Sequence, residues 1–368
     1  MNILIVSLYP LERNTSVANS SISIIKGLLD LEHRVTILMP NWSTNETGCD
    51  VAPIRVIRLP GQLEQPYHLS SYWVGKLHSH LDFLDISRGY LKSIRDVVIP
   101  DEYYDVVLSL SDPKVSHIYT DELIQRTKMR YGRWIQHWGD PITGDFTRHY
   151  WWPEWVVRLY ERRIICKADK AVFVTPFTYD MECREHPGLR KQIAFVPLPA
   201  EMLPIVECPK SDKLRLSYLG DYNPSIRNLK PLYDACANLD FVQLTIAGHG
   251  PTYPSVKNIT FLPRIPQQQA QQIENNSDVL VCVCNVTGTM VPGKITYKAS
   301  TNKHILVAIE EENYDAMKAY FESYNRYILC RNTAESISAA LKGIKEKKAD
   351  YTTPERLLPI NVVKEILK

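Results

Sequence analysis

Long apolar runs are absent from the sequence. No window offers about 18 consecutive uncharged apolar residues, the length that a membrane-spanning helix needs. The opening segment MNILIVSLYP has no charged region ahead of a long apolar run, so we expect no secretory signal peptide. None of the 8 cysteines forms a CxxC pair, which favours reduced, buried thiols. The sequence therefore predicts a cytoplasmic protein.

An excess of charge of one sign is also absent. The formal net charge is +2, from 43 Lys and Arg against 41 Asp and Glu. Binding nucleic acid through its phosphates requires a basic excess, so we predict no nucleic-acid partner. Apolar residues make up 45% of the chain and charged residues 23%, the balance of a folded globular protein. The 368 residues suit two domains of roughly 150–200 residues each.

Short apolar runs alternate with segments of helical periodicity in the first half of the chain. This order predicts parallel strands joined by crossover helices. The predicted strands are Asn2–Leu8, Arg34–Met39, Ile54–Leu59, Asp105–Leu110, Arg133–His137 and Lys170–Val174. The predicted helices are Val17–Leu31, Leu84–Val98, Val115–Lys128, Pro153–Cys166 and Pro176–Arg184.

The alternation begins again after a proline-punctuated stretch, residues 197–213, which we interpret as a linker. The predicted strands here are Leu214–Leu219, Phe241–Ala247, Asn258–Leu262, Asp278–Cys284 and His304–Ile309. The predicted helices are Asn228–Asn238, Gln267–Asn275, Lys294–Thr301, Tyr314–Ser323 and Ala334–Lys345. The fold class is therefore α/β, with two Rossmann-like parallel-sheet domains, residues 1–200 and 201–353, that we expect to face a cleft.

The most informative segment follows the predicted strand that ends at Cys284. It reads VPGKITYKASTNKHIL from residue 291. Pro292 suits the first turn of a helix, where unpaired N–H groups attract phosphate. Gly288 and Gly293 leave room for close approach of the backbone to a ligand, and Lys294 adds a positive charge. An ordinary loop–helix turn with a solvated lysine is the alternative interpretation.

This segment resembles the stretch PGK-I-x-EY-x-A-x-G-K-P-I-L of GT-B fold glycosyltransferases of the family 4 type. The first strand with its loop, Leu219–Ala235 and Leu244–Pro251 resemble further parts of that family in the same order. The matches span most of the chain and are more specific in the second domain. The resemblance implies an acceptor-binding domain in residues 1–200 and a nucleotide-sugar-binding domain in residues 201–353. It also implies that residues 354–368 cross back onto the first domain.

The function that the resemblance implies is transfer of a sugar from a nucleotide-sugar donor to a glycan or lipid-linked acceptor. Transfer in this family is metal-independent, needs no cofactor beyond the donor, and usually retains the anomeric configuration. Positive side chains stabilise the charge that grows on the departing diphosphate. We therefore expect a bacterial enzyme of surface-polysaccharide synthesis.

Carried over residue by residue, the resemblance places the diphosphate between the Gly220 loop and the helix that begins near Pro292. Arg227 takes the position of the family's phosphate-binding lysine, and its fork suits phosphate well. We assign catalytic roles to His137, Arg227 and Lys294. The substrate-binding candidates are Gly220, Lys230, Gly248, Gly250, Thr289, Met290, Val291, Gly293, Tyr297, Asp140 and Asn14.

The sequence departs from the family pattern at three positions. Asp221 replaces an arginine, and Thr289 and Tyr297 replace two glutamates. A carboxylate cannot stabilise a leaving phosphate, and a tyrosine makes one hydrogen bond to ribose where a carboxylate makes two. A catalytically degenerate partner subunit and a sugar-nucleotide 2-epimerase therefore stay open as alternatives. A nicotinamide dehydrogenase is disfavoured, because Ser7–Ser16 after the first strand contains no glycine.

Polar residues also follow strands of the first domain. His137 matches by position a family histidine near the donor sugar, and a buried structural histidine is the alternative. Asp140 lies in a Gly-Asp-Pro turn, which turn formation alone also explains. Asn14, Thr15 and Ser16 lie in the loop before Val17, in a position to cap the following helix.

Two further patterns bear on metals and membranes. His78 and His80 have no third ligand nearby in the sequence, so no metal site is predicted. The run Tyr150–Trp155 is followed by arginines up to Arg163, which mixes aromatic rings with cations. Core packing of the tryptophans is our first interpretation, and peripheral contact with a membrane is the alternative.

Overall fold

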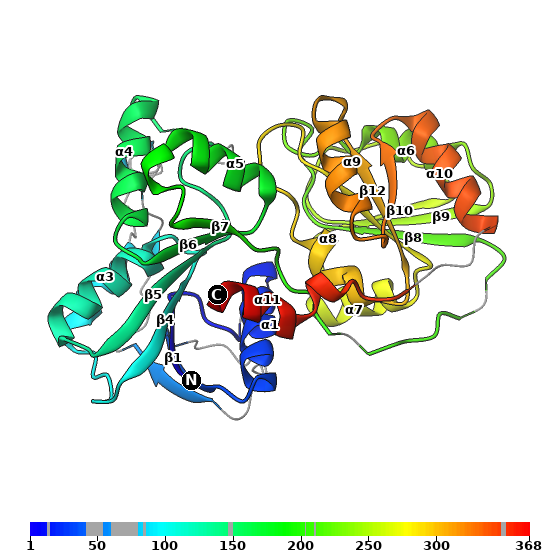
Figure 1. The fold of residues 1–368 in the computed structure, drawn as a ribbon. Helices are drawn as coiled ribbons and strands as arrows, with labels where there is room; N and C mark the ends of the chain where they lie inside the picture. The colour runs from blue at the N-terminus through cyan, green and yellow to red at the C-terminus, as the bar shows by residue number, and fades with distance from the viewer. Residues whose placement is uncertain are drawn as a thin grey trace, which may run out of the picture. The chain divides into compact units, whose positions relative to one another are not determined.

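The computed structural model describes residues 1–12, 15–41, 54–59, 80–83, 86–145, 150–202, 204–209, 211–346 and 351–368. The chain divides into two compact units: Met1–Pro199 with Pro359–Lys368, and Ala200–Leu358. Each unit is built on one sheet whose paired strands are all parallel, with helices packed against it (Figure 1). The predicted fold class, α/β with two Rossmann-like domains, is confirmed. The acceptor and donor roles of the two units, and the cleft expected for them, stay predictions.

Unit 1 holds the larger sheet. Its strands are β1 (Asn2–Ser7), β2 (Arg34–Met39), β3 (Arg55–Arg58), β4 (Tyr104–Leu110), β5 (Tyr131–Trp138), β6 (Lys170–Phe173) and β7 (Ile193–Phe195). They lie in the order β3-β2-β1-β4-β5-β6-β7. The central strands are apolar on both faces, as a sheet covered by helices on each side requires.

The helices of unit 1 alternate with its strands. They are α1 (Ser16–Asp30), η1 (Ile86–Arg95), α3 (Val115–Thr127), α4 (Glu154–Ile165), α5 (Pro176–Glu185), η2 (Pro187–Leu189) and α11 (Pro359–Leu367). Thr15 caps α1 by accepting the N–H of Ala18, and it is one of the three residues that the sequence predicted for this role. The predicted helix Leu84–Val98 is in part the 3₁₀ helix η1, which packs Tyr90 and Ile94 beneath the sheet.

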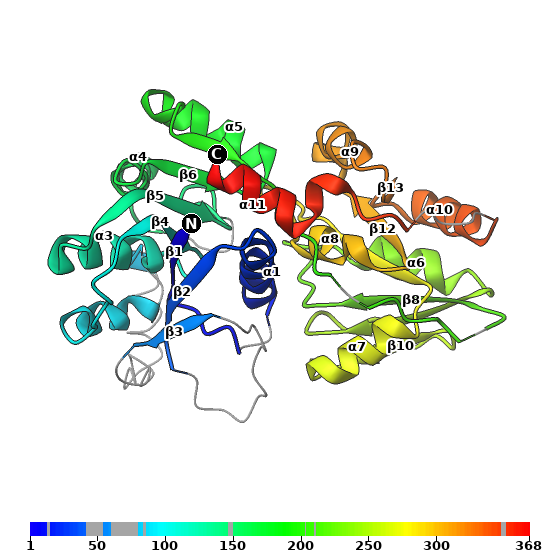
Figure 2. The ribbon, with the colours of Figure 1, turned by 60° about the horizontal axis from the view of Figure 1, so that its bottom comes forward.

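The end of the chain belongs to unit 1. In both views α11 adjoins α1, although more than 300 residues separate them in the sequence (Figures 1 and 2). Val362, Val363 and Ile366 pack with Ile24 of α1 in one apolar cluster. The approach is close at Gly27, where an added Cβ would lie 2.5 Å from the carbonyl oxygen of Pro359. A larger side chain at Gly27 would therefore displace α11.

Unit 2 repeats the architecture with one strand fewer. Its strands are β8 (Leu214–Leu219), β9 (Val242–Ala247), β10 (Ile259–Leu262), β11 (Val279–Val283), β12 (His304–Ile309) and β13 (Ile328–Arg331). Their order, β10-β9-β8-β11-β12-β13, matches the first six strands of unit 1. The helices are α6 (Lys230–Ala237), α7 (Gln267–Asn275), α8 (Lys294–Tyr297), η3 (Lys298–Ser300), η4 (Glu311–Asn313), α9 (Tyr314–Glu322), α10 (Ala334–Glu346) and η5 (Glu355–Leu357).

Three differences from the predicted elements have simple causes. The edge strands β7 and β13 were not predicted, because each is only three or four residues long. The predicted helix Lys294–Thr301 is a four-residue α-helix continued by one 3₁₀ turn. The β-branched residues Ile295 and Thr296, together with Ser300 and Thr301, have low helix propensity, which accounts for the short helix.

Candidate functional site

The strand order places a topological switch point in each sheet. Chain connections run outward in opposite directions from β1 and β4 in unit 1, and from β8 and β11 in unit 2. In open parallel sheets ligands bind beyond the carboxyl ends of the strands at such a point. The segments after β8 and β11 carry most of the predicted site residues. Gly248 and Gly250 follow β9, and His137 and Asp140 lie at the end of β5 and just after it.

Glycines make the loop after β8 unusually compact. Gly220 and Gly248 both have φ of +148°, a conformation that L side chains rarely adopt. An added Cβ on Gly248 would lie 2.2 Å from the carbonyl oxygen of Gly220, and one on Gly250 would overlap the ring of Tyr222. The two glycines predicted to bind substrate after β9 therefore have a structural task as well: they let the loops after β8 and β9 touch.

Arg227 lies in the loop after β8 and reaches the loop after β11. Its Nε donates to the Asn285 side-chain oxygen at 2.9 Å, and Asn285 Nδ2 donates to the Met290 carbonyl at 2.9 Å. The Val286 N–H adds a backbone hydrogen bond to Ile226 at 2.8 Å. These bonds hold the guanidinium between the two loops that flank the switch point. Asn285, which sequence reasoning missed, is thus the residue that positions Arg227.

Lys294 lies beside the same loop. A Cβ added to Gly220 would lie 3.0 Å from Lys294 Nζ, so the ammonium group sits against bare backbone. Burial lowers the pKa of Lys294, and the neighbouring charges of Arg227 and Lys298 act in the same direction. Within the described residues neither Lys294 nor Arg227 forms an ion pair with a carboxylate. The two cations therefore lie near one another, with Lys294 against the backbone of Gly220.

The other charged residues near this loop are already paired. Asp221 forms an ion pair with Arg264 and accepts the His249 N–H at 3.0 Å. The hydrogen bond from Arg264 is the main reason that the pKa of Asp221 is lowered. Lys230, a predicted phosphate ligand, instead bonds Asp234 at 2.5 Å on the surface of α6. Lys230 is therefore the weaker candidate, and Arg264 is a cation that the sequence pattern did not single out.

The segment at the start of α8 differs from its predicted geometry. A helix of four residues has almost no macrodipole, so side-chain charge rather than the helix end must attract phosphate here. Gly288 has φ of +89°, whereas Gly293 is in the ordinary αR region. Tyr297 is 6% exposed, and Thr289 and Val291 are partly buried in the loop. Their contacts with a donor stay predictions.

Unit 1 has a polar cluster at the carboxyl ends of β4 and β5. Buried Lys114 forms an ion pair with Asp145 at 2.9 Å and a longer one with Asp112 at 3.9 Å. Burial and the charge of Asp112 raise the pKa of Asp140 well above its usual range. Turn formation alone therefore does not account for Asp140, because an exposed turn aspartate would keep its usual pKa. Sequence reasoning missed Lys114 and Asp145, because neither lies in a family motif.

His137 occupies the end of β5. The side chain is 3% exposed, and its Nε2 has no hydrogen-bond partner. Burial lowers the pKa of His137 to about 4, so the ring is neutral at neutral pH. His117, which is also buried, bonds the Ser109 hydroxyl at 2.8 Å and packs on Trp138. A neutral His137 can exchange a hydrogen bond with a sugar hydroxyl, but it cannot supply a positive charge.

Several predictions concern residues away from these loops. Asn14 and His78 lie outside the described residues. The interpretation of the tryptophans as core residues is wrong for Trp151, Trp152 and Trp155, which are 63%, 44% and 63% exposed. Trp151 and Trp152 precede α4, and Trp155 lies in its first turn. The cysteines that the structure describes form no disulfides, and most are buried.

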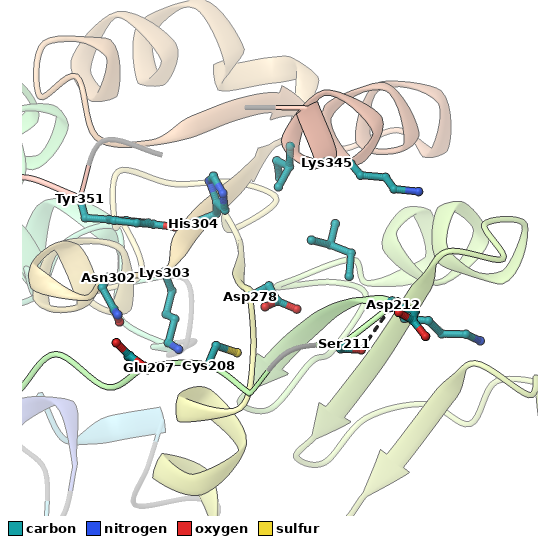
Figure 3. Close-up of a pocket in the computed structure, with 13 residues that line it drawn as sticks. Glu207, Cys208, Ser211, Asp212, Asp278, Asn302, Lys303, His304, Lys345 and Tyr351 are labelled. Carbon is teal, nitrogen blue, oxygen red and sulfur yellow. Dashed lines mark hydrogen bonds between the residues drawn. The ribbon is translucent and has the colours of Figure 1, made fainter. Parts of the chain in front are cut away.

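A separate pocket of about 530 Å³ lies in unit 2 (Figure 3). Leu214, Asp278 and His304, which line it, mark the amino ends of β8, β11 and β12. It is therefore at the opposite edge of the sheet from Gly220, where parallel sheets do not usually bind ligands. One of its charged residues, Asp278, forms an ion pair with Arg215 at 3.2 Å. We assign it no function.

Comparison with solved structures places this architecture among GT-B proteins. No protein-family model matches the chain, and no curated protein matches its sequence. Three structures are similar along almost their whole length. HepE of Anabaena, solved with UDP and glucose, has a TM-score of 0.55 at 11% identity and covers 100% of this chain and 94% of its own. A UDP-GlcNAc 2-epimerase from Methanocaldococcus jannaschii has a TM-score of 0.55 at 11% sequence identity, and the match covers 100% of this chain and 99% of the epimerase. A glycosyltransferase from Rickettsia africae has a TM-score of 0.51 at 12% sequence identity, and the match covers 99% of this chain and 93% of that transferase.

These similarities establish the fold. The chain has the GT-B fold, which glycosyltransferases and a 2-epimerase share, so the sequence-based expectation of that fold is confirmed. At 11–12% identity the comparisons carry no residue-level assignment, and the narrower resemblance to family 4 stays a prediction. In the part of the chain that the structure describes, every helix is too short or too polar to span a bilayer.

Proposed function

We propose that the protein is a glycosyltransferase that uses a nucleoside-diphosphate sugar as donor. The observation that carries this proposal is the proximity of two cations, Arg227 and Lys294, which form no ion pair with a carboxylate among the described residues. Lys294 lies against the bare backbone of Gly220. Bringing like charges together costs free energy in the absence of an anion. A bound diphosphate removes that cost and accepts hydrogen bonds from both side chains. HepE, which shares the fold, was solved with UDP, so UDP is the first ligand to test.

The chemistry requires charge stabilisation on the leaving group. The bond between the anomeric carbon and the diphosphate oxygen breaks, and an acceptor hydroxyl oxygen bonds to the same carbon. The hydroxyl proton passes to the departing diphosphate, whose growing charge Arg227 and Lys294 stabilise. Arg227 is held by Asn285 before donor arrives, so little reorganisation is needed as the bond breaks. This account uses no metal, and retention of configuration remains part of the proposal.

The acceptor is proposed to be a glycan or lipid-linked intermediate of a surface polysaccharide, reached in the bacterial cytoplasm at a membrane. Trp151, Trp152, Trp155 and Leu159 expose large apolar side chains around the start of α4. Arg162 and Arg163 are exposed on the same helix. Aromatic rings with nearby cations suit the interface of an anionic bilayer. Co-sedimentation with anionic vesicles, compared between wild type and Trp155→Ala, tests this contact; equal binding would contradict it.

A screen of nucleotides tests the donor site first. Thermal unfolding is followed with UDP, GDP, ADP and their common sugar conjugates, because a ligand of the folded state raises its stability with occupancy. We expect one base to stand out and Arg227→Ala to remove most of the shift. The selected nucleotide-sugar is then tested for sugar transfer to extracted lipid-linked acceptors. If no nucleotide diphosphate shifts the unfolding temperature, the proposal is wrong.

A 2-epimerase is the second candidate, favoured by the carboxyl cluster in unit 1. Epimerisation next to the anomeric carbon needs removal and return of a proton at C2, and Asp140, with its raised pKa, is suited to such an exchange. Incubation of the protein with UDP-GlcNAc in D₂O separates the two functions. An epimerase places deuterium at C2 without an acceptor, whereas a transferase leaves the C2 hydrogen in place.

A further inference from the structure

A second set of polar side chains is buried in unit 1, away from the switch point. Glu161 comes from α4, Glu182 from α5, and His186 caps the end of α5. They are 0%, 0% and 4% exposed. One ligand atom from each lies within 4.8 Å of the others. Neither the fold comparison nor the proposed transfer reaction gives these residues a task.

The key atoms in this set have no hydrogen-bond partners. Both carboxylate oxygens of Glu182 and Nε2 of His186 are buried and unsatisfied. Glu182 Oε2 and His186 Nε2 face one another at 3.5 Å, which is long for a hydrogen bond. Buried polar atoms left in this state are costly.

Glu161 completes the set with a fixed orientation. Its two oxygens accept the backbone N–H groups of Ile142 and Thr143. A carboxylate has about four lone-pair sites, so two backbone donors leave room for another ligand. The two backbone bonds hold the Glu161 carboxylate in place as outer partners hold a metal ligand.

A positive charge is missing from this set. Two buried carboxylates lie together, and no arginine or lysine pairs with either in the described chain. Something must neutralise them, and the choice is a proton or a metal ion. A proton on Glu182 would remove one charge, but the 3.5 Å between its Oε2 and His186 Nε2 is long for the hydrogen bond that such a proton would make.

We propose that Glu161, Glu182 and His186 bind one divalent transition-metal ion of the zinc type. One imidazole nitrogen with two carboxylates is a donor set that zinc accepts. Ligand atoms at zinc's usual bond lengths of about 2.0–2.1 Å in tetrahedral geometry lie about 3.3–3.4 Å apart. The 3.5 Å between Glu182 Oε2 and His186 Nε2 is therefore close to the spacing that a bound ion needs. His186 is the C-cap of α5, four residues after Glu182, and its backbone N–H still bonds the Glu182 carbonyl, which keeps the two residues adjacent at the end of the helix.

The role of the ion is structural. It joins α4 and α5 to the loop after β5 through the backbone bonds of Glu161 at residues 142 and 143. That loop also carries Asp140 and Asp145, which face Lys114. The ion thus stabilises the loop after β5, which carries part of the polar cluster, without contacting substrate. The inference is independent of the transferase proposal, because it is tested without any nucleotide or acceptor.

Metal loading of the full chain tests the proposal. Because the three side chains are buried, the protein is unfolded in denaturant with a chelator, freed of both, and refolded with Co²⁺ or Zn²⁺. Loosely held ions are removed by gel filtration, and metal content is measured by mass spectrometry. The variants are Glu182→Gln and His186→Ala. The matched controls are Glu185→Gln, the neighbouring glutamate on α5, and His33→Ala.

We expect about one ion per chain in the wild type and both controls, since the site takes a single metal. Loss of Glu182 or His186 should weaken retention by more than the roughly 10–100-fold that loss of an outer partner costs. X-ray absorption at the cobalt edge should show nitrogen and oxygen ligands only. A sulfur ligand would assign the metal to a cysteine and overturn the proposal.

A wild type that refolds without stoichiometric metal would also overturn it, since a shared proton would then satisfy the carboxylates. Equal metal retention in Glu182→Gln and His186→Ala would have the same meaning. If these variants do not fold, the wild type alone decides. Zinc should raise its unfolding temperature after refolding, and an unchanged temperature contradicts the proposal.

Discussion

The two sheets share the order of six strands, but the charged side chains at their switch points are arranged differently. Beside β8 and β11, Arg227 and Lys294 converge without carboxylate partners among the described residues. Beside β4 and β5, Lys114 is surrounded by Asp112, Asp140 and Asp145. The first arrangement leaves positive charge for an incoming anion. In the second arrangement the lysine and the aspartates neutralise one another, and the pKa of Asp140 is raised above its usual range.

The comparison shows how one architecture supports different tasks. Fold alone does not determine function, which depends on the side chains at the switch point. Glycines let the loops after β8 and β9 touch beside Lys294, whereas the carboxyl ends of β4 and β5 carry the buried side chains of Lys114 and the neutral His137. We therefore expect substitutions in unit 2 to act first on ligand binding and rate. Those in unit 1 should act first on stability and its pH dependence.

The largest expected effect comes from removing both cations. The double variant Arg227→Ala, Lys294→Ala should lower the transfer rate by about three decades or more, since one such contact contributes roughly 2–4 kcal/mol to the barrier. The two neighbours share one diphosphate, so their effects should not simply add. The turnover number at saturating donor is measured, with Lys230→Ala as control because Lys230 already pairs with Asp234. Wild-type turnover in a folded double variant would contradict the assigned site.

Removing the cation of unit 1 should act on stability instead. Lys114→Met leaves buried carboxylates unpaired, and breaking a buried ion pair in this way costs about 3–5 kcal/mol. The partners raise the pKa of Lys114, so this contribution is fully present below the pKa of an unfolded lysine and is lost only at more alkaline pH. Urea unfolding at neutral pH measures it. Lys167→Met, which removes an exposed partner of Asp121, should change stability by less than about 1 kcal/mol; equal losses in both variants would refute the prediction.

A smaller effect distinguishes the glycines of unit 2. Gly248→Ala places a Cβ 2.2 Å from the Gly220 carbonyl oxygen, so the loops after β8 and β9 must separate. Overpacking of this kind typically costs about 1–3 kcal/mol. Gly343→Ala is the control: nothing lies within 4 Å of its added Cβ in α10. This control should gain about 0.5–1 kcal/mol from helix propensity. Thermal unfolding compares the two, and a neutral Gly248→Ala would show that the loops do not need this contact.

The pH dependence of stability provides a finer comparison. The pKa of Asp140 is raised in the folded protein, mainly by burial and Asp112, so the folded state binds this proton more tightly. Stability should therefore fall as pH rises from the ordinary aspartate pKa toward the folded value. Asp140→Asn keeps the shape but cannot titrate. Its denaturant midpoint should fall less than that of the wild type between pH 4 and neutral; parallel curves would mean that Asp140 is an ordinary carboxylate.

His137 should produce the smallest change at neutral pH. Burial lowers its pKa from 6.5 to about 4, so folding opposes protonation of the ring. The corresponding loss of stability is absent above pH 6.5 and grows as pH falls toward 4. His137→Gln should remove that part of the acid sensitivity while leaving stability at pH 8 nearly unchanged. A ring that titrates near 6.5 by NMR would contradict this environment.

The fold was largely predictable because its strands are long and apolar. β2, α7 and β12 have the predicted bounds, since hydrophobic periodicity and turn residues mark both ends. The edge strands β7 and β13 carry too few residues for a pattern. α8 is shorter than predicted because it contains β-branched residues, which disfavour a helix. The resemblance to the family motif gave no indication of this shortening.

The candidate site was predictable only in part. Gly220, Arg227 and Lys294 belong to motifs, so the sequence identified them and the structure brings them together. Asn285 and Arg264 act through contacts between segments far apart in sequence, which no local pattern encodes. The same holds for Lys114 with Asp145, and for Glu161 with Glu182 and His186. Local patterns thus located the cations but not the residues that hold or neutralise them.

The most direct test of the central claim is calorimetric titration with UDP, UMP and uridine at one fixed salt concentration. If Arg227 and Lys294 bind the diphosphate, wild-type affinity should rise with each phosphate. Each charge-assisted hydrogen bond is worth about 1.5–3 kcal/mol, so UDP should bind at least tenfold more tightly than uridine. In the folded Arg227→Ala, Lys294→Ala variant the three ligands should bind with similar, weak affinity. An unchanged preference for UDP in that variant would show that the diphosphate lies elsewhere.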